Sequence, residues 1–402
     1  MKEWRALLAA PGFRAFWLAL LCNNLGSWGV MATLPILVAE RFGAGMVLVL
    51  SLGLRVLPKL ILAPVAGGLL RWFGPARTAG MAMLLMALLT ALLPWCGSLI
   101  LLQVLIGVIG TLDLFITPGL LSLRVPVTPP GLEMAGNTMC SVADRLGKVA
   151  GPALGGLAVI AGFAPAFSGF AVLIAVAAVP VFRLSVAPAG SSTRSRAGSV
   201  IAFLDMIRTD RQVAGLLIAA VTYSVMLGGL RPFLFWANRD WYGASDTAWT
   251  SLLVAQGGGA LIGALASALF VARLLRRMSA YTLNLLTGLL EGAIHLLLLA
   301  AQTSTQAIVI LALAGIPEII STAAWFTAIQ GRLAPAQQAL FFTFAAPLWD
   351  LCSAAGIASA ALHAGGMLSL SGYWALVSLI STLPLLPLLA AHRLQVRSQR
   401  LP

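Results

Sequence analysis

Residues 137–156 read NTMCSVADRLGKVAGPALGG, an apolar run with three charged residues in its middle. These residues are Asp144, Arg145 and Lys148. A charge at bilayer depth costs about 2.5–3.5 kcal/mol by insertion scales, so it usually faces a cavity or a partner. Polar and small residues recur here every three or four positions, so they share one helix face. We predict a membrane helix that lines a wet cavity. The alternative is that the charges pair only to lock helices together.

The composition outside this stretch also indicates a membrane protein. Of the 402 residues, 60% are hydrophobic and only 9% are charged, whereas soluble domains carry about 25% charged residues. A helix needs about 20 apolar residues to span a bilayer, and runs of that length recur along the whole chain. The sequence therefore predicts an all-α integral membrane protein.

The apolar runs and the breaks between them give the expected order of spans. We expect twelve transmembrane helices at residues 13–38, 46–70, 78–95, 98–123, 137–156, 163–183, 212–236, 248–272, 279–300, 304–328, 338–361 and 366–391. A Ser-, Gly-, Pro- and Arg-rich break separates the two sets of six and is typical of a linker. The predicted domains are an N-terminal six-helix bundle (1–184), a cytoplasmic linker (185–211) and a C-terminal six-helix bundle (212–402).

The basic residues set the expected orientation. The net charge is +13, but Lys and Arg gather at alternate breaks, as the positive-inside rule requires, rather than in a nucleic-acid-binding patch. Only Arg41 and Arg239 fall in outside loops. We therefore expect a multi-pass protein of the inner (plasma) membrane with both termini in the cytoplasm. The four cysteines lack ligand-like spacing, so no metal site, disulfide framework or cofactor is expected.

A weak internal repeat relates the two halves. The segment Gly110-Thr-Leu-Asp113 in the fourth predicted span is echoed by Gly315-Ile-Pro-Glu318 in the tenth. Asp144 in the fifth span similarly corresponds to Asp350 in the eleventh. Each pair lies six spans apart, as a duplicated six-helix unit requires. We predict two pseudo-symmetric bundles around a central cavity.

Acidic residues within predicted spans are the candidates for proton coupling. A carboxyl group in low-dielectric surroundings can bind and release a proton near neutral pH. Asp113 is the first choice and Glu318 the second, because they occupy corresponding mid-span positions and each follows a Gly by three residues. A structural ion pair is the alternative for any one of them. The full set is Asp113, Glu318, Asp144, Asp350 and Glu291.

Basic residues within spans are the candidates for substrate binding. Arg55 and Lys59 lie one turn apart in the second span, and Arg145 and Lys148 lie in the fifth. Because Arg offers a bidentate fork to carboxylates, these residues favour an anionic or zwitterionic substrate. The rival interpretation is that acids of the same half neutralise them. The other predicted substrate-binding residues are Asn23, Asn24 and Trp325.

Local motifs resemble those of the major facilitator superfamily. Residues 67–77, GGLLRWFGPAR, occupy the loop where that family has a Gly-x-x-x-Asp-Arg-x-Gly-Arg signature. Gly67 and Gly74 match its glycines, but Arg71 and Trp72 replace its Asp and Arg, so the family's gating network is altered here. Residues 151–156, GPALGG, resemble the antiporter motif of superfamily exporters. Residues 13–28 and 54–69 are similar to the branch of macrolide-efflux proteins and the enterobactin exporter.

This resemblance implies a proton-coupled exporter of a small polar or amphipathic metabolite, with a carboxylate-type siderophore as the first candidate. Its partners would be that substrate, protons and membrane lipid, with no nucleic acid, and we expect a monomer. A lysophospholipid flippase, a multidrug exporter and a non-transporting receptor or scaffold remain alternatives. An enzyme is not expected, because the sequence shows no nucleophile–base arrangement and no metal-ligand cluster.

Overall fold

The structure is a computed structural model that describes residues 2–59, 61–62, 72–184 and 196–398. These residues form helices and contain no strand. In lipid a helix satisfies its own backbone hydrogen bonds, which is why a chain of this composition is helical. Of the family-like signature, Gly67 and Arg71 lie outside the described residues, as do linker residues 185–195; Trp72 is described and exposed.

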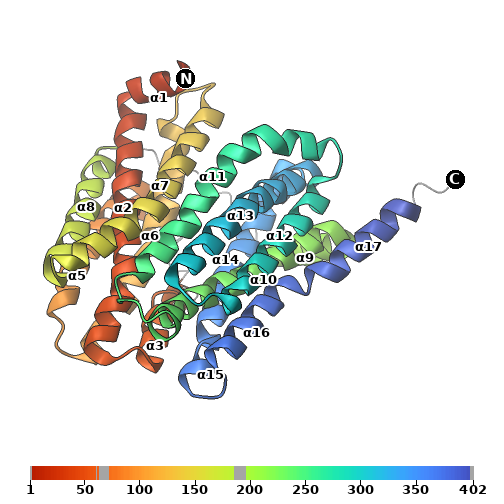
Figure 1. Cartoon of the computed structure of the whole chain (residues 1–402). Helices are drawn as coiled ribbons and strands as arrows, with labels where there is room; N and C mark the ends of the chain where they lie inside the picture. The colour runs from red at the N-terminus through yellow and green to blue at the C-terminus, as the bar shows by residue number, and fades with distance from the viewer. Residues whose placement is uncertain (1, 60, 63–71, 185–195, 399–402) are drawn as a thin grey trace. The chain divides into compact units, whose positions relative to one another are not determined.

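The chain forms two compact units, which are described separately (Figure 1). Unit 1 comprises Met1–Ser191 and Asp246–Val254, and unit 2 comprises Ser192–Ser245 and Ala255–Pro402. The helices of unit 1 are α1 (Lys2–Ala9), α2 (Pro11–Phe42), α3 (Met46–Leu54), α5 (Pro75–Leu92), α6 (Leu99–Val127), α7 (Glu133–Ile160) and α8 (Phe163–Arg183).

Unit 2 includes a helix, α9, within the segment predicted as a linker (185–211). The helices are α9 (Arg196–Thr209), α10 (Arg211–Trp236), α11 (Trp249–Leu275, from residue 255 on), α12 (Ala280–Leu296), α13 (Ser304–Arg332), α14 (Pro335–Ser359), α15 (Ala361–Ala364), α16 (Leu370–Thr382) and α17 (Leu385–Ser398). Short π and 3-10 turns, Ala237–Trp241 and Leu297–Ala300, extend α10 and α12.

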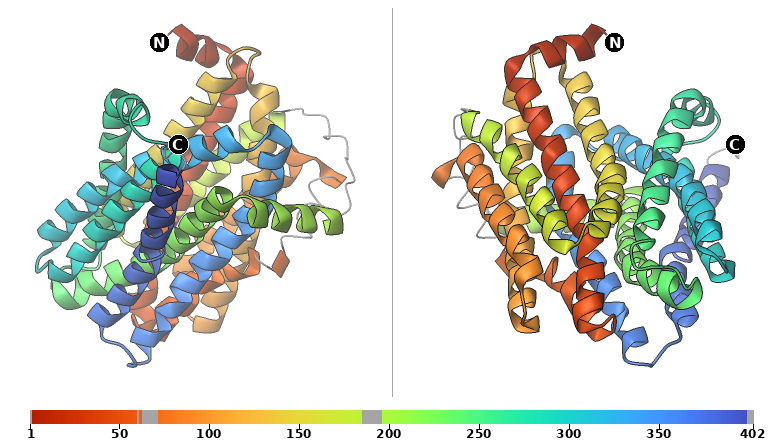
Figure 2. Two further views of the ribbon diagram at one scale, coloured as in Figure 1. Left: turned by 90° about the vertical axis from the view of Figure 1, so that its right-hand side faces the viewer. Right: turned by 60° about the vertical axis from the view of Figure 1, so that its left-hand side comes forward.

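The same packing pattern recurs inside each unit, as the predicted repeat requires. In unit 1, α2 packs against α7 and α8, and α5 packs against α6 and α8. In unit 2, α10 packs against α14 and α16, and α12 packs against α13 and α16. Figure 2 shows α2 running beside α7 in unit 1. Small residues allow these close approaches: a Cβ on Gly151 would lie 2.6 Å from the Cβ of Trp28, and one on Gly228 would meet the backbone oxygen of Ser353.

The prediction of twelve membrane-spanning helices is only partly confirmed. Within the described residues, nine helical segments are long and apolar enough to cross a membrane. The expected second span, 46–70, is interrupted, since α3 ends at Leu54 and a turn follows at Arg55 and Val56. Pro58 explains the break, because it has no N–H to donate to the carbonyl of Leu54. Helix α7, the predicted fifth span, is not among these nine segments. Its apolar run is interrupted by Asp144, Arg145 and Lys148.

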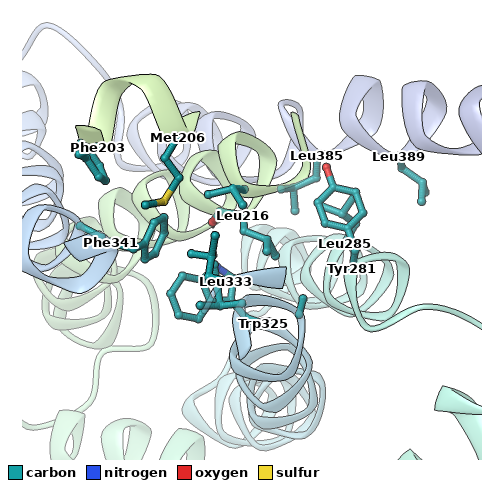
Figure 3. Close-up of a cluster of buried hydrophobic side chains, with 14 residues drawn as sticks. Phe203, Met206, Leu216, Tyr281, Leu285, Trp325, Leu333, Phe341, Leu385 and Leu389 are labelled. Atoms are coloured by element: carbon teal, nitrogen blue, oxygen red, sulfur yellow. Dashed lines mark hydrogen bonds between the residues drawn. The ribbon is translucent and has the colours of Figure 1, made fainter. Parts of the chain in front are cut away.

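Aromatic and aliphatic side chains form a buried cluster at one end of unit 2, shown in Figure 3. Phe203 and Met206 of α9 pack onto Phe341 of α14, with ring centroids of the two Phe residues 6.2 Å apart. Trp325 of α13 belongs to the same cluster, and the centroid of its ring lies 5.9 Å from that of Phe341. Helix α9 therefore packs against the helices of unit 2 through Phe203 and Met206.

A polar contact caps the same end of unit 2. The Asp210 carboxylate accepts hydrogen bonds from the amides of Gln212 (2.9 Å) and Val213 (3.2 Å) at the start of α10, and it pairs with Arg332 at 2.7 Å. Partial burial alone would raise the pKa of Asp210, but these bonds outweigh it and hold the pKa below its ordinary value of 3.8. The carboxylate therefore stabilises the folded unit in its ionised form.

Candidate functional site

In unit 1, Asp113, the acid predicted first for proton coupling, forms an ion pair with a base. Asp113 of α6 forms an ion pair with Lys59, with Nζ and Oδ2 3.1 Å apart and both side chains about four-fifths buried. Gly110, one turn earlier, lies against the backbone of Arg55, where a Cβ would not fit. The close helix approach predicted from this Gly is therefore present. Asp113 is thus paired with Lys59, a base of the same unit.

Arg55 is the less satisfied of the two bases that follow α3. Its Nη2 lies 3.5 Å from the backbone oxygen of Ser27. Its Nη1 is buried and has no hydrogen-bond partner among the described residues. A guanidinium group with one buried, unpaired end can still accept an anionic ligand.

The polar face of α7 contacts α2. The amide of Asn24 donates to Asp144 at 2.6 Å, and Nζ of Lys148 lies 5.7 Å from the centroid of the Trp28 ring. Asn24 and Asp144 line a cavity of about 130 Å³ together with the buried Asn23. Arg145, on the same helix, is half-buried. Asn23, Asn24 and Asp144 thus lie together. The ammonium group of Lys148 lies over the Trp28 ring.

Unit 2 contains a larger cavity, of about 240 Å³, within its own bundle. Glu291 of α12 and Glu318 of α13 both line it, and Glu291 is only 2% exposed. The hydroxyl of Tyr223 from α10 lies within hydrogen-bonding reach of both carboxylates. Gln256 of α11 also approaches Glu318, with Nε2 3.5 Å from Oε2. The structure thus brings two of the five predicted coupling acids together around one phenol.

Side chains from neighbouring helices complete this cavity. Nε1 of Trp325 donates to the backbone oxygen of Leu216 at 2.8 Å, which fixes the indole ring in the wall. Nδ2 of Asn284 donates to the backbone oxygen (3.1 Å) and hydroxyl (2.9 Å) of Ser321. The opposite atom of this amide, Oδ1, is buried without a hydrogen-bond partner in the described part of the chain. Trp325 is thus a wall residue of this cavity.

Asp350 and His295 lie apart from the carboxylate pair. Asp350 is exposed on α14, and its neighbour Trp349 lines the cavity instead. His295 is fully buried, but its Nδ1 contacts the backbone oxygen of Glu291 at 3.0 Å rather than the carboxylate. Nε1 of Trp374 donates to the backbone oxygen of His295 at 2.9 Å, which ties this turn of α12 to α16.

Comparison with known proteins identifies the fold. The family model described as Major Facilitator Superfamily matches residues 16–368. The chain belongs to this superfamily. No curated protein matches it, so the comparison yields the family without a specific relative.

Solved structures agree with the superfamily assignment. A peptide transporter POT in complex with sulfate has a TM-score of 0.76 at 14% identity, covering 97% of this chain and 98% of that one. The nucleoside transporter NupG has a TM-score of 0.70 at 11% identity, with 94% and 97% covered. The human organic anion transporter MFSD10 (TETRAN) has a TM-score of 0.65 at 16% identity, with 94% and 99% covered. At these identities the likenesses show the fold, that of a multi-pass membrane transporter, and the superfamily assignment rests on the family match.

Sequence reasoning did not identify the whole cavity of this superfamily member. The predicted site residues do not include the lining residues Tyr223, Trp349, Asn284 and Ser321, or the neighbouring Gln256. A usable signal was present: Asn284, Gly288 and Glu291 recur at four and three residues, so they share one face of α12. Glu318, Ser321, Thr322 and Trp325 mark a matching face of α13 in the same way.

The described residues show no group of three or more His, Cys, Asp or Glu placed to hold a metal. The four cysteines are free thiols. The chemistry available in the two cavities is therefore ionic, hydrogen-bonding and aromatic.

Proposed function

We propose that this superfamily member is a proton-coupled secondary transporter of a small polar or amphipathic molecule, and that Glu291, Glu318 and Tyr223 form its proton site. The observation that carries the proposal is the meeting of two carboxylates at one tyrosine hydroxyl inside a cavity. Transport against a gradient requires that proton binding shift the balance between conformational states. A group that couples in this way must therefore bind its proton reversibly.

The carboxylate pair suits this role for an electrostatic reason. Two negative charges in one buried site repel each other, so a single proton shared between them is favoured. Tyr223 from α10 and Gln256 from α11 face the pair, while His295 on α12 turns to the backbone. The described residues that line the cavity include no Lys or Arg. A proton or a cationic ligand would therefore balance the charge of the buried Glu291.

The acids of unit 1 support coupling less well. Asp113 is neutralised by Lys59 at 3.1 Å, and Asp144 is bonded to Asn24 at 2.6 Å. The proposal therefore moves the coupling site from Asp113 to Glu318 and Glu291. Export, the inner-membrane location, cytoplasmic termini and a monomeric state are parts of the proposal that rest on the sequence alone.

A second candidate function is export of a carboxylate-bearing substrate such as a siderophore. The buried, unpaired Nη1 of Arg55 favours it, because a carboxylate would satisfy that donor. The pairing of Lys59 with Asp113 leaves fewer bases for this purpose than the sequence suggested. In this case Arg55→Gln would abolish transport of an anion such as citrate and spare transport of a cation.

The test uses inverted membrane vesicles acidified inside by respiration, with a pH-sensitive dye to report the gradient. A compound exchanged for protons discharges the gradient, so the dye fluorescence recovers. Organic cations, neutral compounds and carboxylates are added in turn. We expect at least one compound to cause recovery with the unmodified protein. Glu318→Gln and Glu291→Gln should each abolish that recovery.

The matched control is Asp205→Asn, which removes an exposed acid of α9 in the same unit. It should behave as the unmodified protein. Full recovery with both glutamine variants, at equal protein levels, would overturn the proposed proton site. Loss of recovery in Asp113→Asn with unchanged protein stability would return the coupling role to unit 1.

A further inference from the structure

The unit 2 cavity has the size and walls of an organic-ligand site. Its volume of about 240 Å³ exceeds what one water or one metal ion fills, and it approaches the lower range of small-molecule pockets. Trp325, Phe326 and Trp349 supply aromatic surface, and Leu227 and Leu385 supply aliphatic surface. The rings of Trp325 and Trp349 lie edge to face with centroids 5.5 Å apart. Such walls favour a ligand with a flat apolar body.

Three buried polar atoms of lining residues have no hydrogen-bond partner among the described residues. They are Oε1 of Glu291, Oδ1 of Asn284 and Nε1 of Trp349. Glu291 is 2% and Asn284 is 5% exposed, so water in the bulk does not satisfy them. The orientation of the Asn284 amide follows from its Nδ2, which donates to the backbone oxygen of Ser321. A buried acceptor left unpaired costs about 1–3 kcal/mol, so a donor supplied by a ligand would be stabilising.

These unpaired atoms specify the polarity of the ligand. Two of the three are acceptors, and one of these belongs to a carboxylate that has a second carboxylate nearby. An ammonium group offers three donors and a positive charge, and it is also attracted to aromatic faces. The remaining donor, Nε1 of Trp349, would suit a hydroxyl or carbonyl oxygen elsewhere on the ligand. A carboxylate ligand would instead be repelled by the negative charge of Glu291, whose Oε1 faces no donor among the described residues.

From this geometry we infer that the cavity of unit 2 binds a small organic cation, with a protonated amine beside Glu291 and Asn284 and an aromatic body against Trp325 and Trp349. The inference names a substrate class for the proposed transporter, and only the competition with a proton rests on the proposed function. The ammonium group and the shared proton compete for the same carboxylates, so binding of one displaces the other. The substrate class is therefore opposite in charge to the one predicted from the bases of unit 1.

The test measures binding calorimetrically to the purified full-length protein in detergent, without any transport step. Three probes share one indole body and differ in charge: tryptamine is cationic, tryptophol is neutral and indole-3-acetate is anionic. We expect tryptamine to bind at least tenfold more tightly than tryptophol, and indole-3-acetate not to bind. This comparison needs no variant, so it is independent of any folding defect.

Variants then locate the site. Glu291→Gln should lower the affinity for tryptamine at least tenfold and leave the affinity for tryptophol unchanged. Asp205→Asn should leave both affinities unchanged. Glu318→Gln is the second variant if Glu291→Gln does not purify as a monodisperse protein. Equal affinities for tryptamine and tryptophol, or preferential binding of indole-3-acetate, would overturn the inference. Tryptamine binding that neither glutamine variant weakens would also overturn it, because the site would then lie elsewhere.

The two proposals fail separately. If tryptamine binds as expected but the glutamine variants still discharge the vesicle pH gradient, the inferred ligand class stands and the proposed proton site is wrong. If the variants lose pH-driven transport but tryptamine does not bind in preference to tryptophol, the proton site stands and the ligand class is wrong. Proton release from the weakly buffered protein on tryptamine addition measures the competition directly. Its absence, with binding intact, would refute the competition.

Discussion

The two units place acids at corresponding positions but surround them differently. In unit 1, Asp113 on α6 faces a lysine, with Nζ of Lys59 3.1 Å away. In unit 2, Glu318 on α13 faces the amide of Gln256 at 3.5 Å and shares Tyr223 with a second acid, Glu291. The glycine one turn before each acid packs against backbone in both units, that of the turn at Arg55 in unit 1 and that of α11 in unit 2. The close backbone packing is thus repeated, while the partners of the acids differ.

This difference separates a structural role from a functional one. A carboxylate neutralised by a lysine in its own bundle mainly holds helices together. A buried carboxylate such as Glu291, with one oxygen unpaired among the described residues in a cavity lined by aromatic rings, leaves charge available for a proton or a cationic ligand. The following experiments probe what the units share and where they differ.

Glycine substitutions should show the largest effect, and it should be the same in both units. In Gly151→Val and Gly228→Val the new Cβ would meet Trp28 and the backbone of Ser353, respectively. Because the backbone of a packed helix cannot shift easily, each change should destabilise its unit by about 3 kcal/mol, the upper end of overpacking costs. The measurement is the unfolding temperature in detergent. In Gly169→Ala, the control, the Cβ would meet no atom of the described residues within 4 Å. Unequal losses in the two units would contradict a repeated packing.

Neutralising the corresponding acids should have opposite effects on stability. Asp113→Asn leaves the ammonium of Lys59 without its counter-ion, so it should cost about 2 kcal/mol and lower the unfolding temperature by several degrees. Glu318→Gln removes repulsion from Glu291, so stability should be unchanged or increased. The double variant Lys59→Met/Asp113→Leu should recover most of the loss of the single variant. Equal destabilisation by Asp113→Asn and Glu318→Gln would remove the distinction between the units.

The ion pair at the end of unit 2 should give a smaller, pH-dependent effect. The pKa of Asp210 is held below its ordinary value of 3.8, so its stabilising contribution is present above about pH 4 and is lost as the pH falls through the lowered value. Asp210→Asn keeps a side chain that can cap α10 and removes the charge. It should cost at most about 1 kcal/mol near neutral pH, because the pair with Arg332 is partly exposed. Unfolding temperatures of variant and unmodified protein should converge below pH 4; a constant difference at all pH values would disprove the charge contribution.

The smallest effect is expected at the cation–π contact of unit 1. Lys148→Met keeps a chain of similar length and removes the charge that lies 5.7 Å from the Trp28 ring. Because Lys148 is exposed, the change should cost about 0.5–1 kcal/mol in stability. The same loss should disappear in a Trp28→Leu background. Loss of citrate binding without a change in stability would instead assign Lys148 to an anionic substrate.

The sequence by itself determined the class of fold and the division into related halves. A chain with 60% hydrophobic and 9% charged residues must bury its backbone polar groups in helices within lipid. The echo of Gly110–Asp113 in Gly315–Glu318 indicated the repeat, because local spacing on a helix survives even when the rest of a sequence diverges. It also nominated Glu291, Glu318 and Trp325 as functional residues.

Only the tertiary structure decided which charges meet. Lys59 and Asp113 are 54 positions apart in the sequence, and Tyr223, Glu291 and Glu318 come from three helices, so no local spacing relates them. The break in the second predicted span was also missed, because the apolar residues on both sides of Pro58 keep the stretch long enough to be predicted as one span. Helix periodicity fixes which face a side chain is on, but the rotation and neighbours of each helix are set by packing across the bundle. For that reason the acids could be named from the sequence, and their pairing could not.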